Sequence, residues 1–160
     1  MSPRTAGRTV WRLASARYSD HAFDGEGARL YGGRWNHPGT SMVYCSSTLA
    51  LAALEFFVHL EPDLAPPDLV AVAAHLPAGL DAEALEVEAL PANWRTYPAP
   101  ERLRDLGNGW VRSGRTAVLQ VPSSVISHEM NVLLNPAHPD FAKIHIREAE
   151  PFSFDPRMWK

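Results

Sequence analysis

Residues 42–60 read MVYCSSTLALAALEFFVHL and contain the strongest secondary-structure signal of the chain. Met42–Cys45 has the composition of a short strand, and Ser46 or Ser47 can cap a helix over Thr48–Leu60 that ends at Glu61–Pro62. At about 13 residues this helix is well short of the roughly 20 that span a bilayer, and it carries a carboxylate. The stretch therefore predicts a strand followed by a buried helix, and no membrane anchor.

Further predicted elements lie on both sides of this strand and helix in the sequence. Thr9–Leu13, Leu69–Leu76, Ala117–Val121 and Ile144–Ile146 are predicted as strands, Ser19–Gly27 as a loop, and Pro100–Ser113 as a helix with Leu103, Leu106 and Trp110 on one face. No repeat or low-complexity tract interrupts the chain. We predict an α+β fold, a single domain over residues 1–160 with a core of about 10–154, built on a small twisted sheet with flanking helices.

Composition narrows the class of function. The 160 residues are 46% hydrophobic, which is enough to build a core, and the formal net charge is -3. A chain with this acidic balance and a pI near 6.1 has no general attraction to a phosphate backbone, so direct nucleic-acid binding is not expected. A single cysteine allows neither an internal disulfide nor a multi-thiolate metal site, and the first residues lack an apolar signal core. These features predict a cytoplasmic protein.

Several familiar motifs are incomplete. Gly25–Leu30 begins like a dinucleotide fingerprint but places Leu30 where glycine or alanine is needed, and a P-loop lysine is absent. His128–Glu129 lacks the second histidine of a zinc-protease helix, and Glu55 with His59 supplies only two ligands, so no metal site is predicted. Cys45 has no adjacent base and is interpreted as a core residue.

Three polar groupings remain, and each has two interpretations. Thr48, Glu55 and His59 form one stripe of the predicted helix, which faces either solvent or a cleft. The glycines around Arg34 form either a hairpin or a loop that brings a planar guanidinium against a pyrophosphate. The hydroxyls and amides of residues 121–126 and 131–139 serve either turns and caps or a binding site.

Together these residues resemble one family, the RES domain, which is named for its Arg, Glu and Ser. The resemblance covers nearly the whole chain from Val10 to Phe154, and it rests on Tyr31–Asn36, Val43–Tyr44, Ala53–Glu55, Val121–Ser123 and Asn131–Phe141. It implies a fold like that of ADP-ribosyltransferases and a bacterial toxin that acts on NAD+, with an antitoxin partner of the Xre helix-turn-helix type. NAD+ would be the substrate, and no cofactor or metal is implied.

The resemblance also implies roles for individual residues. Glu55 would stabilise the ribosyl cation, Arg34 would hold the pyrophosphate, and Tyr44 would stack against or orient the nicotinamide end. Ser123, or its neighbour Ser124, would hydrogen-bond the dinucleotide. Tyr31 and Asn131 complete the predicted substrate-binding residues.

The acceptor of the ADP-ribosyl group stays open at this point. Water gives NAD+ hydrolysis, phosphate gives phosphorolysis, and a protein side chain gives ADP-ribosylation; NAD+ depletion is the first hypothesis. A different class of function is a catalytically silent module that binds a partner through exposed Trp94, Tyr97 and Trp159.

Overall fold

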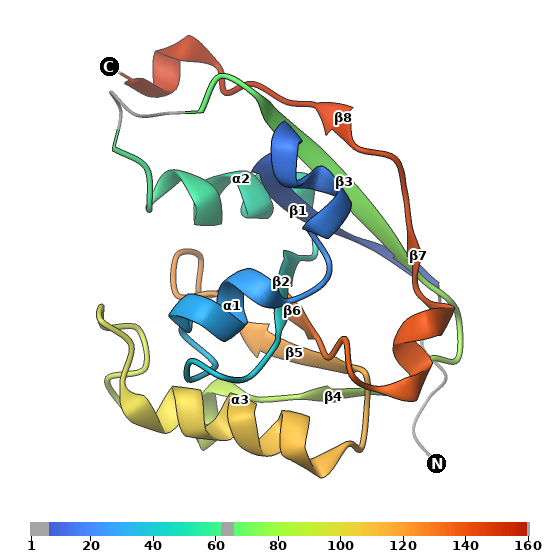
Figure 1. Ribbon diagram of the computed structural model, residues 1–160. Coiled ribbons are helices and arrows are strands. Elements are labelled where there is room, and N and C mark those ends of the chain that lie inside the picture. The colour runs from blue at the N-terminus through green and yellow to red at the C-terminus, as the bar shows by residue number, and fades with distance from the viewer. Residues whose placement is uncertain (1–6, 62–65, 160) are drawn as a thin grey trace.

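One mixed sheet of eight strands organises the computed structural model, which describes residues 7–61 and 66–159 (Figure 1). The strand order is β4-β5-β6-β2-β1-β3-β7, and β8 also pairs with β3. The strands are β1 (Arg8–Ser15), β2 (Val43–Ser46), β3 (Leu69–Leu76), β4 (Ala82–Ala84), β5 (Val118–Pro122), β6 (Met130–Leu134), β7 (His145–Ile146) and β8 (Glu150–Pro151). The helices are α1 (Glu26–Tyr31), α2 (Leu49–Phe57) and α3 (Glu101–Ser113), with short 3-10 helices between them.

The predicted α+β class is confirmed, and the predicted strands correspond to β1, β2, β3, β5 and β7. Three strands were not predicted: β4, β6 and β8. The prediction of a loop over Ser19–Gly27 is wrong in part, because a 3-10 helix covers Ala16–His21 and α1 begins at Glu26. None of the described helices combines the length and the apolar character that crossing a membrane requires.

Strand β6 lies inside the sheet and is covered on both faces. Val132 and Leu134 join one hydrophobic cluster, whereas Leu133 joins the cluster on the opposite side, and all three side chains are fully buried. Successive side chains of a strand point to opposite faces, so this alternation places one core on each side of the sheet. The second core lies under α3 and includes the indoles of Trp35, Trp94 and Trp110.

The sheet is weakly joined between β1 and β2. Strand β1 pairs with β3 over its whole length, from Arg8↔Leu76 to Ser15↔Leu69, but it pairs with β2 only at Trp11↔Ser46. Helix α2 packs against both β1 and β2 and covers this junction. Any side chain on the inner part of α2 is therefore held where the two halves of the sheet meet.

Helix α2 differs from its predicted limits. Its N-cap is Thr48, whose hydroxyl accepts a hydrogen bond from the Leu51 amide at 3.1 Å, so the prediction of a Ser46 or Ser47 cap is wrong. The last helical residue is Phe57, and Pro62, which was predicted to stop the helix, lies outside the described residues. Only Leu51 and Ala52 are fully buried, so the predicted burial applies to one face.

The C-terminal segment returns over α2 (Figure 1). Phe154 lies at its centre, with ring centroids 6.5 Å from Phe56, 5.8 Å from Phe57 and 5.4 Å from Trp159. Phe152 meets the same ring edge-on at 5.1 Å. Aromatic pairs at these separations are mutually attractive, so this cluster holds α2 against the C-terminal segment.

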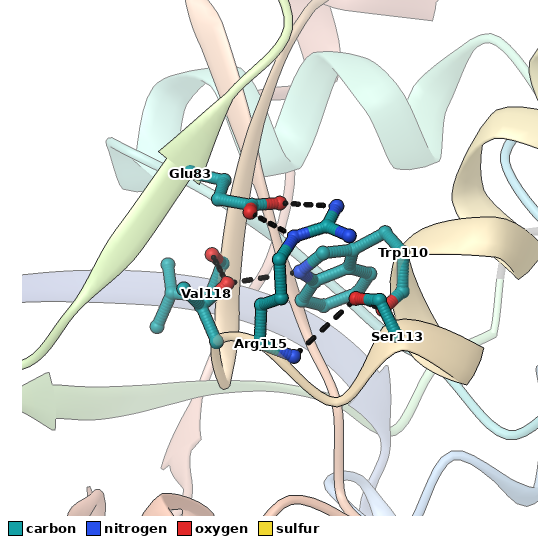
Figure 2. Close-up of polar contacts among 6 residues, drawn as sticks. Glu83, Trp110, Ser113, Arg115 and Val118 are labelled. Atoms are coloured by element: carbon teal, nitrogen blue, oxygen red, sulfur yellow. Dashed lines mark hydrogen bonds and ion pairs between the residues drawn. The ribbon is translucent and has the colours of Figure 1, made fainter.

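Helix α3 packs very closely against the segment that follows α1. A Cβ atom on Gly107 would lie 1.7 Å from the carbonyl oxygen of Trp35, so only glycine fits at this helix position. Trp110 of α3 donates from its indole nitrogen to Thr116, and Arg115, just after the helix, pairs with Glu83 of β4 (Figure 2). These contacts link the C-terminal end of α3 to β5 and to the edge strand β4.

Candidate active site

Glu55 of α2 lies at the centre of a polar cluster at the sheet junction. Its Oε1 atom accepts one hydrogen bond from the Ser123 hydroxyl at 2.6 Å and another from the Asn131 side-chain amide at 2.7 Å. Within residues 7–61 and 66–159, no cation forms an ion pair with this carboxylate. Neutral donors fix the orientation of Glu55 and leave its negative charge uncompensated at short range.

Ser123 follows β5 directly and is fully buried. While its hydroxyl donates to Glu55, its oxygen accepts from the backbone amides of Val125 and Ile126 at 3.1 and 3.0 Å. The hydroxyl is thereby fully used, and its direction is set by the turn after β5. Of the two adjacent serines, the structure brings Ser123 to Glu55, whereas the carbonyl of Ser124 accepts from Arg95.

Asn131 reaches Glu55 from β6, and its own orientation is fixed by β2. The Ser46 hydroxyl donates to the Asn131 side-chain oxygen at 2.7 Å, and the two residues face each other across the β2–β6 ladder. Because that oxygen is occupied as an acceptor, the amide nitrogen is the group that points to the carboxylate. Strands β2 and β6 thus position one donor for Glu55.

The loop that carries Arg34 is held by buried polar contacts. Asn36 is fully buried and donates to the carbonyls of Ala28, His37 and Thr40 at 2.9 to 3.0 Å. Its side-chain oxygen accepts from the Tyr44 hydroxyl at 2.6 Å, and that hydroxyl accepts from the Trp35 amide at 3.0 Å. Burial raises the pKa of Tyr44 above its ordinary value, so the phenol stays neutral and serves as a fixed donor.

Gly33 allows this loop to approach Tyr44. A Cβ atom at Gly33 would lie 2.6 Å from the Tyr44 hydroxyl oxygen, which is too close for any other residue without movement of the ring. The structure therefore gives Tyr44 a role in positioning the Arg34 loop. Its predicted contact with nicotinamide stays a prediction.

Arg34 is half-buried and points to the segment before α3. Its Nη1 atom donates to the carbonyls of Trp94 and Thr96 at 2.9 and 3.0 Å. No described residue engages Nε or Nη2, so one edge of the guanidinium fork remains available. Burial lowers the pKa of Arg34, and the negative charge of Glu55 acts in the opposite direction, which places the carboxylate within electrostatic range.

A second guanidinium lies beside the same loop. Arg104 of α3 donates from Nε to the Gly33 carbonyl at 3.2 Å. Its positive charge adds to the effect of burial in lowering the pKa of Arg34, and it partly offsets the larger effect of burial, which raises the pKa of Tyr44. Two guanidinium groups therefore create a positive region next to Glu55.

Other predicted residues lie apart from this network. Tyr31, at the end of α1, is 83% exposed, and its contact with substrate stays a prediction. Cys45 is buried in the core, where burial raises the pKa of its thiol to about 12. Trp94 is only 6% exposed, so its predicted place on an exposed partner-binding surface is wrong. Within the described parts of the chain, no group of three or more His, Cys, Asp or Glu residues is arranged to hold a metal.

Sequence reasoning missed four residues that shape the site. They are Asn36, Ser46, Arg104 and Arg95. Asn36 was visible as the end of the Arg34 motif, but nothing in the sequence indicates that its amide is buried. Arg104 and Arg95 bind partners that are 71 and 29 positions away in the sequence. Contacts this far apart cannot be predicted from local sequence patterns.

The chain is similar to known proteins over almost its whole length. Residues 9–155 match the RES domain. A protein of Sphingobium sp. (strain YBL2) named "Prs ADP-ribosylating toxin" is 40% identical over 154 residues, covering 94% of this chain and 96% of the relative. A "Toxin Res" of Yersinia enterocolitica is 34% identical over 151 residues, covering 93% of this chain and 98% of the relative.

A solved structure is similar in fold at low sequence identity. It is titled "Crystal structure of the M.tuberculosis MbcT-MbcA toxin-antitoxin complex", and the match has a TM-score of 0.74 at 15% identity. The match covers 96% of this chain and 87% of that chain. At this identity the likeness concerns the path of the backbone.

Proposed function

The chain belongs to the RES domain family, and on that premise we propose that it is the toxin of a bacterial toxin-antitoxin pair that cleaves NAD+ in the cytoplasm. The bond broken is the glycosidic bond between nicotinamide and ribose. The observation that carries this proposal is the state of Glu55, a half-buried carboxylate held by Ser123 and Asn131 with no neutralising ion pair among the described residues.

Cleavage develops positive charge on the ribose while nicotinamide leaves with the bonding electron pair. An oriented carboxylate lowers the energy of this transition state because it is fixed before the charge appears. Oε1 of Glu55 is occupied by its two donors, which leaves Oε2 to face the sugar and its hydroxyls. The partly dry surroundings strengthen the effect relative to water.

The pyrophosphate would lie against the two arginines. The free edge of the Arg34 fork matches two phosphate oxygens, and the charge of Arg104 adds to the attraction. Tyr44 and Asn36 keep the loop in place during binding. Preorganisation of this kind reduces the entropy that substrate binding must overcome.

The acceptor defines the final product. With water, a new bond forms between the ribose C1″ atom and the water oxygen, and one proton is released with nicotinamide and ADP-ribose. With phosphate, the product is ADP-ribose-1″-phosphate. Transfer to a protein side chain is a second candidate, and it is favoured by the name of the relative that is 40% identical, an ADP-ribosylating toxin.

An antitoxin partner follows from the same proposal. A free enzyme that consumes NAD+ would deplete its own cell, so an inhibitor is required, and the family resemblance suggests a helix-turn-helix protein of the Xre type. The solved structure of similar fold is itself a toxin-antitoxin complex. Contact with DNA would belong to the partner, in keeping with the net charge of -3 on this chain.

The experiment is incubation of the purified chain with NAD+ in buffers with and without phosphate, followed by mass analysis of small molecules and protein. Nicotinamide with ADP-ribose, with ADP-ribose-1″-phosphate, or with a mass-shifted target from a cell extract separates the three acceptors. If the free chain releases no nicotinamide in any arm, the proposal is wrong. If a complex with the proposed Xre-type antitoxin cleaves NAD+ as fast as the free chain, the inhibitory partnership is wrong.

A further inference from the structure

Residues 94–97 form a strap across the site. The carbonyls of Trp94 and Thr96 accept from Arg34, and Arg95 donates to the carbonyls of Ser124 and Val125 at 3.0 and 3.4 Å. The buried indole of Trp94 anchors the strap in the core below α3. The strap therefore connects the Arg34 loop with the turn that supplies Ser123.

Tyr97 is the outermost side chain of this strap. It is 79% exposed, and its ring centroid lies 6.1 Å from that of His59, with the two planes tilted by 53°. His59 follows α2 four residues after Glu55, so this contact joins the strap to the helix that carries the carboxylate. The phenol of Tyr97 is also one of the groups that raise the pKa of Arg34, so Tyr97 lies within electrostatic range of this guanidinium.

The Tyr97 ring contacts His59 and is otherwise largely open to solvent, at the edge of a site rich in positive charge. Such a ring is suited to stacking with a nucleobase, because every base offers a planar π surface.

We propose that Tyr97 is the stacking platform for the adenine ring of NAD+ and that His59 supports its rear face. This inference rests on the proposed function. The reacting ribose belongs at the half-buried Glu55, and the pyrophosphate at Arg34 separates the two nucleosides of the substrate. The base that does not react is therefore the one to lie on the exposed ring. Tyr97 would determine substrate affinity without taking part in the chemistry.

The test compares Tyr97→Ala with Tyr97→Phe on two substrates, NAD+ and nicotinamide mononucleotide, which contains the same glycosidic bond but no adenine. For Tyr97→Ala we expect KM for NAD+ to rise about tenfold with little change in kcat, as is typical of losing one stacking contact. Kinetics on nicotinamide mononucleotide should stay unchanged. Tyr97→Phe should retain the wild-type KM because it keeps the ring.

Tyr18→Ala is the matched control, since Tyr18 is also exposed, at 58%, on the 3-10 helix Ala16–His21 that packs against β1 and β3. Equal losses on both substrates, or an unchanged KM for NAD+ with Tyr97→Ala, overturn the inference while the proposed function stands. Calorimetry with ADP-ribose gives a readout without cleavage. If ADP-ribose binds wild type and Tyr97→Ala equally, the inference is wrong; if Tyr97→Ala binds it about tenfold more weakly, the inference holds even where no NAD+ is cleaved.

Discussion

Two carboxylates, one on the edge strand β4 and one on helix α2, have different hydrogen-bond partners. Glu83 on the edge strand β4 pairs with Arg115 through two contacts, at 2.5 and 3.2 Å, close to the end of α3 (Figure 2). Glu55, at the junction of β1 and β2, is instead held by a hydroxyl and an amide. The edge carboxylate is paired with a cation, whereas the partners of the central carboxylate among the described residues are neutral donors.

The two regions also differ in how far along the sequence their contacts reach. The hydrogen bonds of Trp110, Ser113 and Thr116 join residues at most six positions apart. The bonds of Glu55 to Ser123 and Asn131 span 68 and 76 positions. The end of α3 can form locally, whereas the Glu83–Arg115 pair spans 32 positions and requires β4 to be in place. The network around Glu55 requires more of the fold, because strands β2, β5 and β6 and helix α2 must all be assembled.

The largest expected effect comes from removing the central charge. Glu55→Gln keeps the size and the acceptor atom of the side chain, so the fold should persist, but kcat for nicotinamide release should fall by about 100- to 1,000-fold. The measurement is the release of nicotinamide at saturating NAD+. Glu83→Gln is the control, because β4 lies three strands away from β2, and its kcat should match the wild type.

A rate for Glu55→Gln within a few-fold of wild type would remove Glu55 from the reaction. An equal loss in both variants would show that the two carboxylates do not differ as described. Circular dichroism and the Tm of each variant distinguish loss of chemistry from loss of fold.

The next effect concerns the aromatic cluster that supports only one of the two regions. Phe154→Ala removes the four ring contacts of Phe154, which are those with Phe56, Phe57, Phe152 and Trp159. The ring is half-buried, so we expect a loss of about 2 kcal/mol in the free energy of unfolding, less than a fully buried phenylalanine would give. This corresponds to a fall in Tm of about 4–8 °C for a chain of this size.

Because Phe56 and Phe57 directly follow Glu55 on α2, Phe154→Ala should also lower kcat at temperatures where the protein is still folded. Phe154→Leu should restore most of the stability, because it refills much of the apolar volume. A Tm unchanged by Phe154→Ala would show that the C-terminal segment does not fix α2.

The sequence predicted the residues around Glu55 better than it predicted the strands that position them. Helix α2 was predictable because a capped, apolar run of this length has few alternatives. Strand β6 was not, because the short run Met130–Leu134 contains Asn131 and is followed by Asn135, and these amides are equally typical of turns. A strand buried on both faces does not alternate between apolar and polar residues, so the sequence pattern typical of a half-buried strand is absent here.

Strand β4 escaped prediction for a related reason. Ala82–Ala84 has low strand propensity and becomes a strand only by pairing in parallel with β5 across the crossover of α3. Trp94 was predicted to be exposed, yet its indole is buried in the core under α3. In each case the deciding contact is distant in sequence.

A smaller effect is expected at the positive side of the site. Arg34→Lys keeps the charge but loses the fork, and a single ammonium cannot hold the Trp94 and Thr96 carbonyls while also chelating two phosphate oxygens. We expect affinity for ADP-ribose to fall about tenfold, measured by calorimetry. Arg29→Lys on α1, an exposed arginine that pairs with Glu26, should bind ADP-ribose like wild type. Unchanged affinity in Arg34→Lys would place the pyrophosphate elsewhere.

The smallest effect is expected at the edge carboxylate itself. Glu83→Gln breaks the pair with Arg115, whose guanidinium is largely exposed, with 61% of the side chain accessible. Water screens such pairs, and ordering two long side chains costs entropy, so Tm should change by no more than about 1–2 °C. The hydrogen bond to Glu83 raises the pKa of Arg115, so the arginine stays charged at any working pH and the pair responds to salt rather than to arginine titration. The difference in Tm between wild type and Glu83→Gln should therefore vanish in about 1 M NaCl, where the Debye length is roughly 3 Å. A large, salt-independent loss would mean that β4 depends on this ion pair, and that the edge carboxylate contributes to the stability of the sheet.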